Sequence, residues 1–249
     1  MTQTEQLTQA DTPPRRAIFL PGYSEATGDI DGIEKALQES GFGYDEVQVF
    51  KPWELSRLNW RFRQARQKRH ELAEAAPGAE VFAHSLGHNL VRRCIDATAY
   101  HLLHAPKVSS PRQLIQGMNA DGEQAQAIRD KQGEPSDREV EIQQHLADYD
   151  NRPKESNLSL ADKIRQWVQF PRMMMTDRIK LAQELKRRNP GAEVTIGASK
   201  DDAYFPLDDQ EIARANELEI PLIEMAGTHS ELAWRPVAYL KEYYRKLRS

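Results

Sequence analysis

Ser85 lies in the stretch of the chain with the clearest chemical pattern, Val81–Leu90. It follows an apolar run and precedes a helical pattern, and it has the small residues Ala83 and Gly87 two positions away on either side. A serine on a sharp strand-to-helix turn needs small neighbours there, because bulky side chains would clash. Such a turn projects the serine Oγ above a sheet, where it can act as a nucleophile. Taken alone, the pentapeptide is also compatible with a serine that caps an ordinary helix.

A serine hydroxyl is a poor nucleophile near neutral pH unless a base accepts its proton, and the base must itself be oriented. Two later loops supply residues of these types. Asp201 and Asp202 follow a strand pattern that ends at Ala198, and His229 follows the last strand pattern of the chain. Because the carboxyl ends of parallel strands share one edge of a sheet, these side chains are expected to gather near Ser85. Their order along the chain is serine, aspartate, histidine.

Apolar runs of strand length alternate with helical patterns along the chain. The predicted strands cover residues 17–20, 47–50, 80–84, 99–105, 192–198 and 220–226. The predicted helices lie near residues 30–37, 55–72, 90–95, 179–185, 212–218 and 237–247. This alternation predicts an α/β protein with a largely parallel sheet, helices on both faces and reactive residues at the strand carboxyl ends.

With these motifs in this order, residues 16–248 resemble the small single-domain serine hydrolases of the α/β-hydrolase fold. The resemblance implies a three-layer α/β-hydrolase-like sandwich, with Ser85 as nucleophile and His229 as general base and then acid. It also implies an aspartate that orients His229. The acid of this family commonly lies four residues before a proline, which matches Asp202 before Pro206 and leaves Asp201 as the alternative.

The resemblance also implies an oxyanion hole made of two backbone N–H groups. Similar proteins carry a His-Gly-x motif after the first strand, and Pro21, Gly22 and Tyr23 occupy those places here. The backbone donors would be Tyr23 N–H and Leu86 N–H. Proline in place of histidine leaves the donor intact but changes what braces it, and the same residues also fit a simple turn.

Three parts of the chain differ in character. Residues 1–15 are polar and rich in glutamine and threonine, which predicts a disordered N-terminal tail. Residues 16–106 and 191–249 carry the strand and helix patterns of the α/β-hydrolase core. Residues 107–190 are broken by glycines and dominated by charges of both signs. This segment resembles a helical lid or cap inserted where the family varies its substrate pocket.

Composition and missing motifs narrow the function classes. The net charge of -4 gives no overall footprint for nucleic acid, and the single cysteine, Cys94, fits a reducing compartment and hence the cytoplasm. No apolar stretch is long enough for a membrane span. There is no phosphate-binding glycine motif, and His84, His88, His101 and His104 lack metal-ligand spacing. We therefore expect no cofactor, no metal, no nucleic-acid partner and no membrane span; the oligomeric state is left open.

These patterns predict a serine hydrolase that cleaves a carboxylic ester, thioester or amide of a small-molecule acyl substrate through an acyl-enzyme. Carboxylesterase chemistry is the most economical choice. One alternative is a non-catalytic α/β-hydrolase-like protein whose polar insertion binds a partner. Another is a peptidase or acyltransferase with the same triad. The observation that separates an enzyme from a binding protein is whether Ser85 Oγ lies within hydrogen-bond reach of His229.

Overall fold

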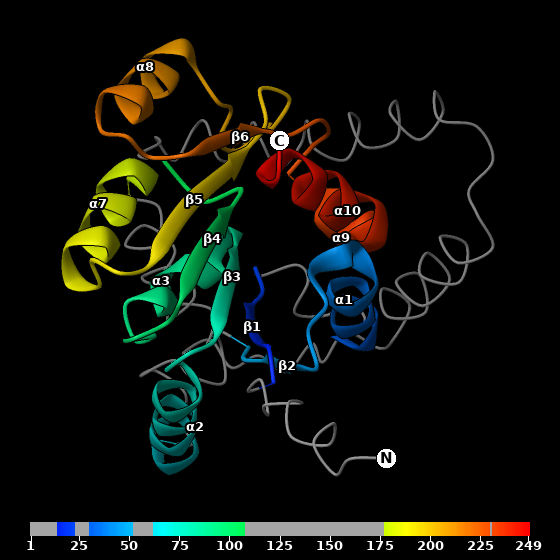
Figure 1. Cartoon of the computed structure of the whole chain (residues 1–249), viewed down its shortest axis with the longest axis vertical. Helices are drawn as coiled ribbons and strands as arrows, with labels where there is room; N and C mark the ends of the chain where they lie inside the picture. Colours follow the sequence, from blue (N-terminus) through cyan, green and yellow to red (C-terminus); the bar gives the residue numbers. More distant parts are fainter. Residues whose placement is uncertain (1–13, 23–29, 52–61, 108–176, 230) are drawn as a thin grey trace, which may run out of the picture.

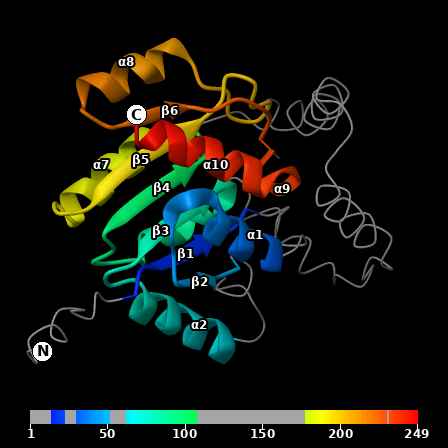
Figure 2. The ribbon, with the colours of Figure 1, turned by 45° about the vertical axis from the view of Figure 1, so that its right-hand side comes forward.

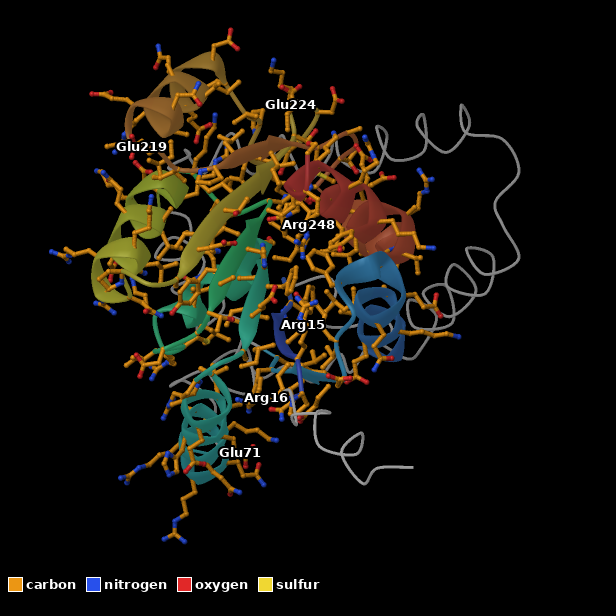
Figure 3. The ribbon with its side chains drawn as sticks, in the orientation of Figure 1. Arg15, Arg16, Glu71, Glu219, Glu224 and Arg248 are labelled. Carbon is orange, nitrogen blue, oxygen red and sulfur yellow. The ribbon has the colours of Figure 1, made fainter. Side chains whose placement is uncertain are left out.

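The strands form one parallel sheet, as the alternation of patterns predicted. The computed structural model describes residues 14–22, 30–51, 62–107, 177–229 and 231–249. Within these residues, six strands lie in the order β2-β1-β3-β4-β5-β6, and every pairing is parallel (Figure 1). Their bounds are β1 Arg16–Leu20, β2 Glu46–Val49, β3 Glu80–His84, β4 Ala99–Leu103, β5 Glu193–Ala198 and β6 Leu222–Glu224. Figure 3 labels Arg16, the first residue of β1, and Glu224, the last residue of β6, which lie toward opposite edges of the sheet.

Helices cover both faces of this sheet. Helices α1 and α10 lie on one side, and α2, α3 and α7 lie on the other (Figures 1 and 2). The bounds are α1 Ile30–Leu37, α2 Phe62–Ala75, α3 His88–Val91, α7 Arg178–Arg188, α8 Asp209–Glu217, α9 Glu231–Trp234 and α10 Pro236–Leu247, with a π-helical turn η1 Gln38–Phe42 and a 3-10 turn η2 Ser85–Gly87. None of the described helices is long and apolar enough to cross a bilayer. The layers are those of the predicted three-layer sandwich.

Strand alternation divides the buried side chains into two cores. Along β1, Phe19 faces the core under α1 and α10, whereas Ile18 and Leu20 face the core under α2, α3 and α7. Successive side chains of a strand point to opposite faces, so a strand that is apolar throughout must be covered twice. Fully burying one such side chain contributes about 1.5–3 kcal/mol. The two cores fix the positions of the strand ends, where the polar residues described below are found.

The helix that follows Ser85 is shorter than the sequence pattern predicted. Its last residue is Val91, and Asp96 has a left-handed backbone with φ 60°. Cys94 is still buried, but Ile95 is 62% exposed and does not join the apolar face that was predicted for it. A chain that turns after one helical turn cannot keep the helical spacing, so that part of the prediction was wrong.

Helix α7 falls inside the range 107–190 that the sequence assigned to a cap. Its buried residues Ile179, Leu181 and Leu185 belong to the core under α2 and α3. Asp177 is the N-cap of this helix, and its carboxylate accepts hydrogen bonds from the N–H groups of Ile179 and Lys180 at 2.9 and 3.0 Å. Residues 108–176, the rest of the predicted cap, lie outside the described residues, as do residues 1–13 of the predicted tail.

Candidate active site

Four polar residues gather at the carboxyl ends of neighbouring strands. Ser85 directly follows β3, His104 directly follows β4, Asp202 lies in the loop after β5, and His229 lies in the loop after β6. These strands are adjacent in the sheet (Figure 2), and all four side chains are buried. The parallel sheet therefore brings together residues that are up to 144 positions apart in the sequence.

The turn at Ser85 has the geometry of a sharp strand-to-helix elbow. Ser85 adopts φ 49°, the left-handed region that L-residues other than glycine enter only at a cost of about 1–2 kcal/mol. Ala83 is fully buried in β3, opposite Leu20 of β1. Gly87 packs so tightly against the end of β1 that a Cβ atom there would lie 1.9 Å from the Leu20 carbonyl oxygen. The small residues of the motif thus allow β1 to approach the elbow.

A continuous chain of hydrogen bonds links Ser85 to Asp202 through His229. The Ser85 Oγ–H donates to His229 Nε2 at 2.8 Å, and His229 Nδ1–H donates to Asp202 Oδ2 at 2.9 Å. The tautomer follows from the partners, because a carboxylate can only accept. Asp201 is exposed, so of the two candidate aspartates the one that contacts His229 is Asp202.

The Asp202 carboxylate is held at both oxygens. Its Oδ1 accepts hydrogen bonds from the backbone N–H groups of Tyr204 and Phe205, both at 2.9 Å. Burial by itself would raise the pKa of Asp202, but the His229 imidazole and the hydrogen bonds from His104 and His229 outweigh it and hold the pKa well below its usual value. Asp202 is therefore ionised at neutral pH.

His104 is the residue of this site that the sequence did not assign. Its Nδ1–H donates to the same Asp202 Oδ2 that His229 uses, also at 2.9 Å, and its side chain is fully buried. Burial lowers the pKa of His104 to about 4, so the ring is neutral at pH 7. Its place at the end of the strand next to β3 was the signal available in the sequence. His101, on the same strand, instead contacts the Tyr243 hydroxyl at 3.0 Å on the α10 side of the sheet.

Two further buried histidines support the backbone of the site. His84 Nε2–H donates to the carbonyl oxygen of His229 at 3.2 Å, and its ring centre lies 5.2 Å from that of His229. His88 Nδ1–H donates to the carbonyl oxygen of Ser85. Burial lowers the pKa of His88 to about 4, so it too is neutral at pH 7.

The donor set at Asp202 also has to be compared with a metal site. One ring nitrogen each of His104 and His229 and one carboxylate oxygen of Asp202 lie within 4.8 Å of one another. The Nδ1 atoms of both histidines contact Asp202 Oδ2. Both nitrogens are 2.9 Å from that oxygen, a hydrogen-bond distance. Bonds of about 2.0–2.2 Å to a tetrahedral zinc ion would instead separate neighbouring ligand atoms by about 3.4 Å. We therefore interpret the three residues as a hydrogen-bonded group.

The backbone donors expected for an oxyanion hole belong to Tyr23 and Leu86. Tyr23 lies outside the described residues. Leu86 directly follows Ser85 in the turn η2. A Cβ atom at Gly87 would lie 2.8 Å from the Pro21 carbonyl oxygen, so the loop that leads from β1 toward Tyr23 begins beside the elbow.

Several solved structures have a similar fold. A comparison with protein-family models and one with curated protein sequences find no match. Solved structures do match. The chain is similar to an α/β-hydrolase enzyme, MGS-M2, from a Medee basin deep-sea metagenome library, with a TM-score of 0.55 and 10% identity over 96% of this chain and 91% of that one.

Two further structures are similar over comparable lengths. One is an E-2-(acetamidomethylene)succinate hydrolase, with a TM-score of 0.53 and 11% identity over 95% of this chain and 92% of that one. The other is a thermophilic esterase, with a TM-score of 0.51 and 10% identity over 95% of this chain and 90% of that one. Together with the parallel sheet and its strand order, these similarities show that the chain has the α/β-hydrolase fold.

Proposed function

We propose that this protein is a serine hydrolase that cleaves a carboxylic ester, thioester or amide through an acyl-enzyme. The observation that carries the proposal is the continuous hydrogen-bond chain from Ser85 Oγ through His229 to Asp202, with distances of 2.8 and 2.9 Å. This is the geometry in which a histidine can take the serine proton while a carboxylate holds its ring.

The reaction begins when His229 Nε2 accepts the proton of Ser85 Oγ as this oxygen bonds to the substrate carbonyl carbon. The carbonyl electron pair moves to the oxygen, and the backbone N–H groups of Tyr23 and Leu86 stabilise that oxyanion. The intermediate collapses, and the leaving group departs with the proton held by His229. A water molecule, activated in turn by His229, then hydrolyses the acyl-enzyme and restores Ser85.

Charge distribution in the site favours the transition state of each step. His229 becomes an imidazolium while the substrate oxygen becomes negative, and the ionised Asp202 stabilises the imidazolium without accepting its proton. Each oxyanion-hole donor typically contributes about 2.7–4 kcal/mol to transition-state stabilisation. The contact between Gly87 and the end of β1 supports a joint role in oxyanion binding for the elbow after β3 and the loop after β1.

Carboxylic esters of small molecules are the substrate class that we favour, because an alcohol is a better leaving group than an amine and an ester therefore needs less activation than an amide. The fold similarity to a thermophilic esterase supports testing esters first. In this proposal, the part of the predicted cap that precedes α7 shapes the acyl pocket. The single cysteine, Cys94, supports assignment to the reducing cytoplasm.

A fluorophosphonate probe tests the proposal, because it labels only an activated serine. We expect the folded wild-type protein to be labelled, and neither Ser85→Ala nor heat-denatured protein to react. A panel of esters, thioesters, amides and peptides, with and without an acceptor alcohol, then separates an esterase from a peptidase or an acyltransferase. Absence of both labelling and ester hydrolysis in the folded protein would favour a non-catalytic binding protein instead.

A further inference from the structure

We propose that His104 is a positioning residue for the hydrolytic reaction: it holds the Asp202 carboxylate and takes up part of the charge that this carboxylate presents to His229. The inference rests on the proposed roles of Ser85, His229 and Asp202.

The hydrogen bonds of Asp202 leave its carboxylate one orientation. Oδ1 accepts two backbone N–H groups, and Oδ2 accepts one imidazole N–H from His229 and one from His104, all at 2.9 Å. A carboxylate oxygen has two lone pairs, so these four donors occupy every acceptor site. Without His104, Oδ2 would keep His229 as its imidazole donor, and the full negative charge of that oxygen would face this ring.

His104 has a strained backbone conformation. His104 has φ 46°, in the left-handed region that favours glycine, and its N–H donates to the Gly197 carbonyl oxygen at 2.7 Å. Ser85 is the other residue of this site with a positive φ. Backbone strain at two strand ends of one site is typical of positions where side-chain direction matters more than local stability.

His104 donates a hydrogen bond without adding a charge. The titratable groups around the rings of His104 and His229 are His84 at the end of β3, Asp202 and Tyr204 in the loop after β5, and Tyr239 of α10. Burial depresses the pKa of His104 to about 4. The neutral His104 imidazole donates to Oδ2 and so reduces, without cancelling, the negative charge that this oxygen presents to His229. We therefore expect His229 to have a lower pKa than it would have as the single imidazole donor to Asp202 Oδ2.

The pH profile of kcat/KM for ester hydrolysis tests this role. Its acid limb reports the protonation of His229 in the free enzyme. For His104→Leu, we expect the acid limb to move to higher pH by about 0.5–1 pH unit, and kcat to fall about tenfold with little change in KM. His104→Asn should restore both, because an asparagine Nδ2–H can take the place of the Nδ1–H and asparagine tolerates the left-handed backbone.

His101→Leu is the matched control, since it removes a buried histidine of β4 that contacts Tyr243 and Glu80 and not Asp202. It should lower the melting temperature and leave the acid limb unchanged. If His104→Leu does not fold, His104→Gly suits the backbone conformation and also lacks the donor. An acid limb that is unchanged or displaced to lower pH in a folded His104 variant would overturn the proposal, and so would failure of His104→Asn to restore it.

Nuclear magnetic resonance of the histidine rings separates this proposal from the proposed function. In the wild type, His104 should carry its proton on Nδ1, and His229 should titrate at a lower pH than it does in His104→Leu. These signals do not require turnover, so the effect of His104 on the titration of His229 can be measured even if the protein hydrolyses none of the substrates. An active enzyme whose His229 titrates identically in wild type and His104→Leu would contradict the role of His104 alone.

Discussion

Gly87 lies directly against Leu20, with its Cα so close to the end of β1 that a Cβ atom would be 1.9 Å from the Leu20 carbonyl oxygen and 2.5 Å from its carbonyl carbon. Gly87 has φ -59°, which any residue adopts, so glycine is required here for space and not for backbone freedom. The atoms in the way belong to the backbone of a central strand and cannot rotate aside. The contact therefore joins the Ser85 elbow to the loop that begins at Pro21.

Gly87→Ala should separate the elbow from β1. We expect a loss of about 1–3 kcal/mol or more in the free energy of unfolding and a fall in kcat, because the Leu86 N–H moves with the elbow. Denaturant unfolding and an ester assay measure the two effects. Gly191→Ala is the matched control, since no atom lies within 4 Å of a Cβ there. Equal behaviour of the two variants would contradict this interpretation of the elbow.

The two neighbouring aspartates should differ sharply on substitution. Asp202→Asn keeps the size of the side chain but presents an amide to His229, so we expect kcat to fall by about 10³–10⁴-fold. Asp201→Asn changes an exposed side chain and should leave kcat near the wild-type value. Steady-state kinetics on one ester measure kcat for both variants and the wild type. A large loss in Asp201→Asn with none in Asp202→Asn would assign the acid to the other residue.

Acid should destabilise the protein before its carboxylates titrate. His88 and His104 have pKa values of about 4 in the folded state because both are buried, against 6.5 in an unfolded chain. Between these values the unfolded chain binds more protons, so the stability present above pH 6.5 is lost as pH falls toward 4. Such a difference in pKa corresponds to about 3 kcal/mol per histidine.

Urea unfolding at several pH values measures this dependence. His88→Asn keeps a donor for the Ser85 carbonyl but removes one titrating ring. We expect the slope of unfolding free energy against pH to decrease by about 1.4 kcal/mol per pH unit relative to wild type. An identical slope in the variant would mean that His88 is not the neutral, buried group described above.

Arg178 should be essential for the loop that carries Asp202. Its guanidinium is fully buried, pairs with Glu211 at 2.6 and 2.9 Å, and donates to the carbonyl oxygens of Phe205 and Pro206 at 3.1 and 3.4 Å. Arg178→Met removes the guanidinium from these acceptors and leaves Glu211 paired with Lys107 at 3.4 Å, so we expect a loss of about 3–5 kcal/mol. In a double-mutant cycle, adding Glu211→Gln should cost less than in the wild-type background, and purely additive losses would show that the pair is not coupled.

Cys94 should resist thiol reagents in the folded protein. The thiol is buried, and burial raises its pKa to about 12, which leaves almost no thiolate at neutral pH. Iodoacetamide should therefore modify Cys94 only in denaturant and should not inhibit hydrolysis. Rapid modification of the native protein, followed by mass spectrometry, would show that the segment after α3 opens readily.

Local patterns determined the elements and most of the residues that meet at the site. The apolar runs indicated the central strands β1, β3, β4 and β5, because a strand buried on both faces has to be largely apolar. The small residues around Ser85 indicated a sharp turn for the same steric reason that Gly87 shows. The serine, aspartate and histidine were found because parallel strands bring their carboxyl ends to one edge.

Three features depended on the tertiary structure. The sequence favoured Asp202 over Asp201 only through a resemblance in its spacing to Pro206, whereas the contact with His229 depends on the direction of a side chain in a loop. The helix after Ser85 ends at Val91 because the chain turns, which apolar spacing does not record. His104 joins the site because β4 lies between β3 and β5 and its backbone turns at that residue. A hydrogen bond between residues 98 positions apart is specified by packing and not by any local pattern.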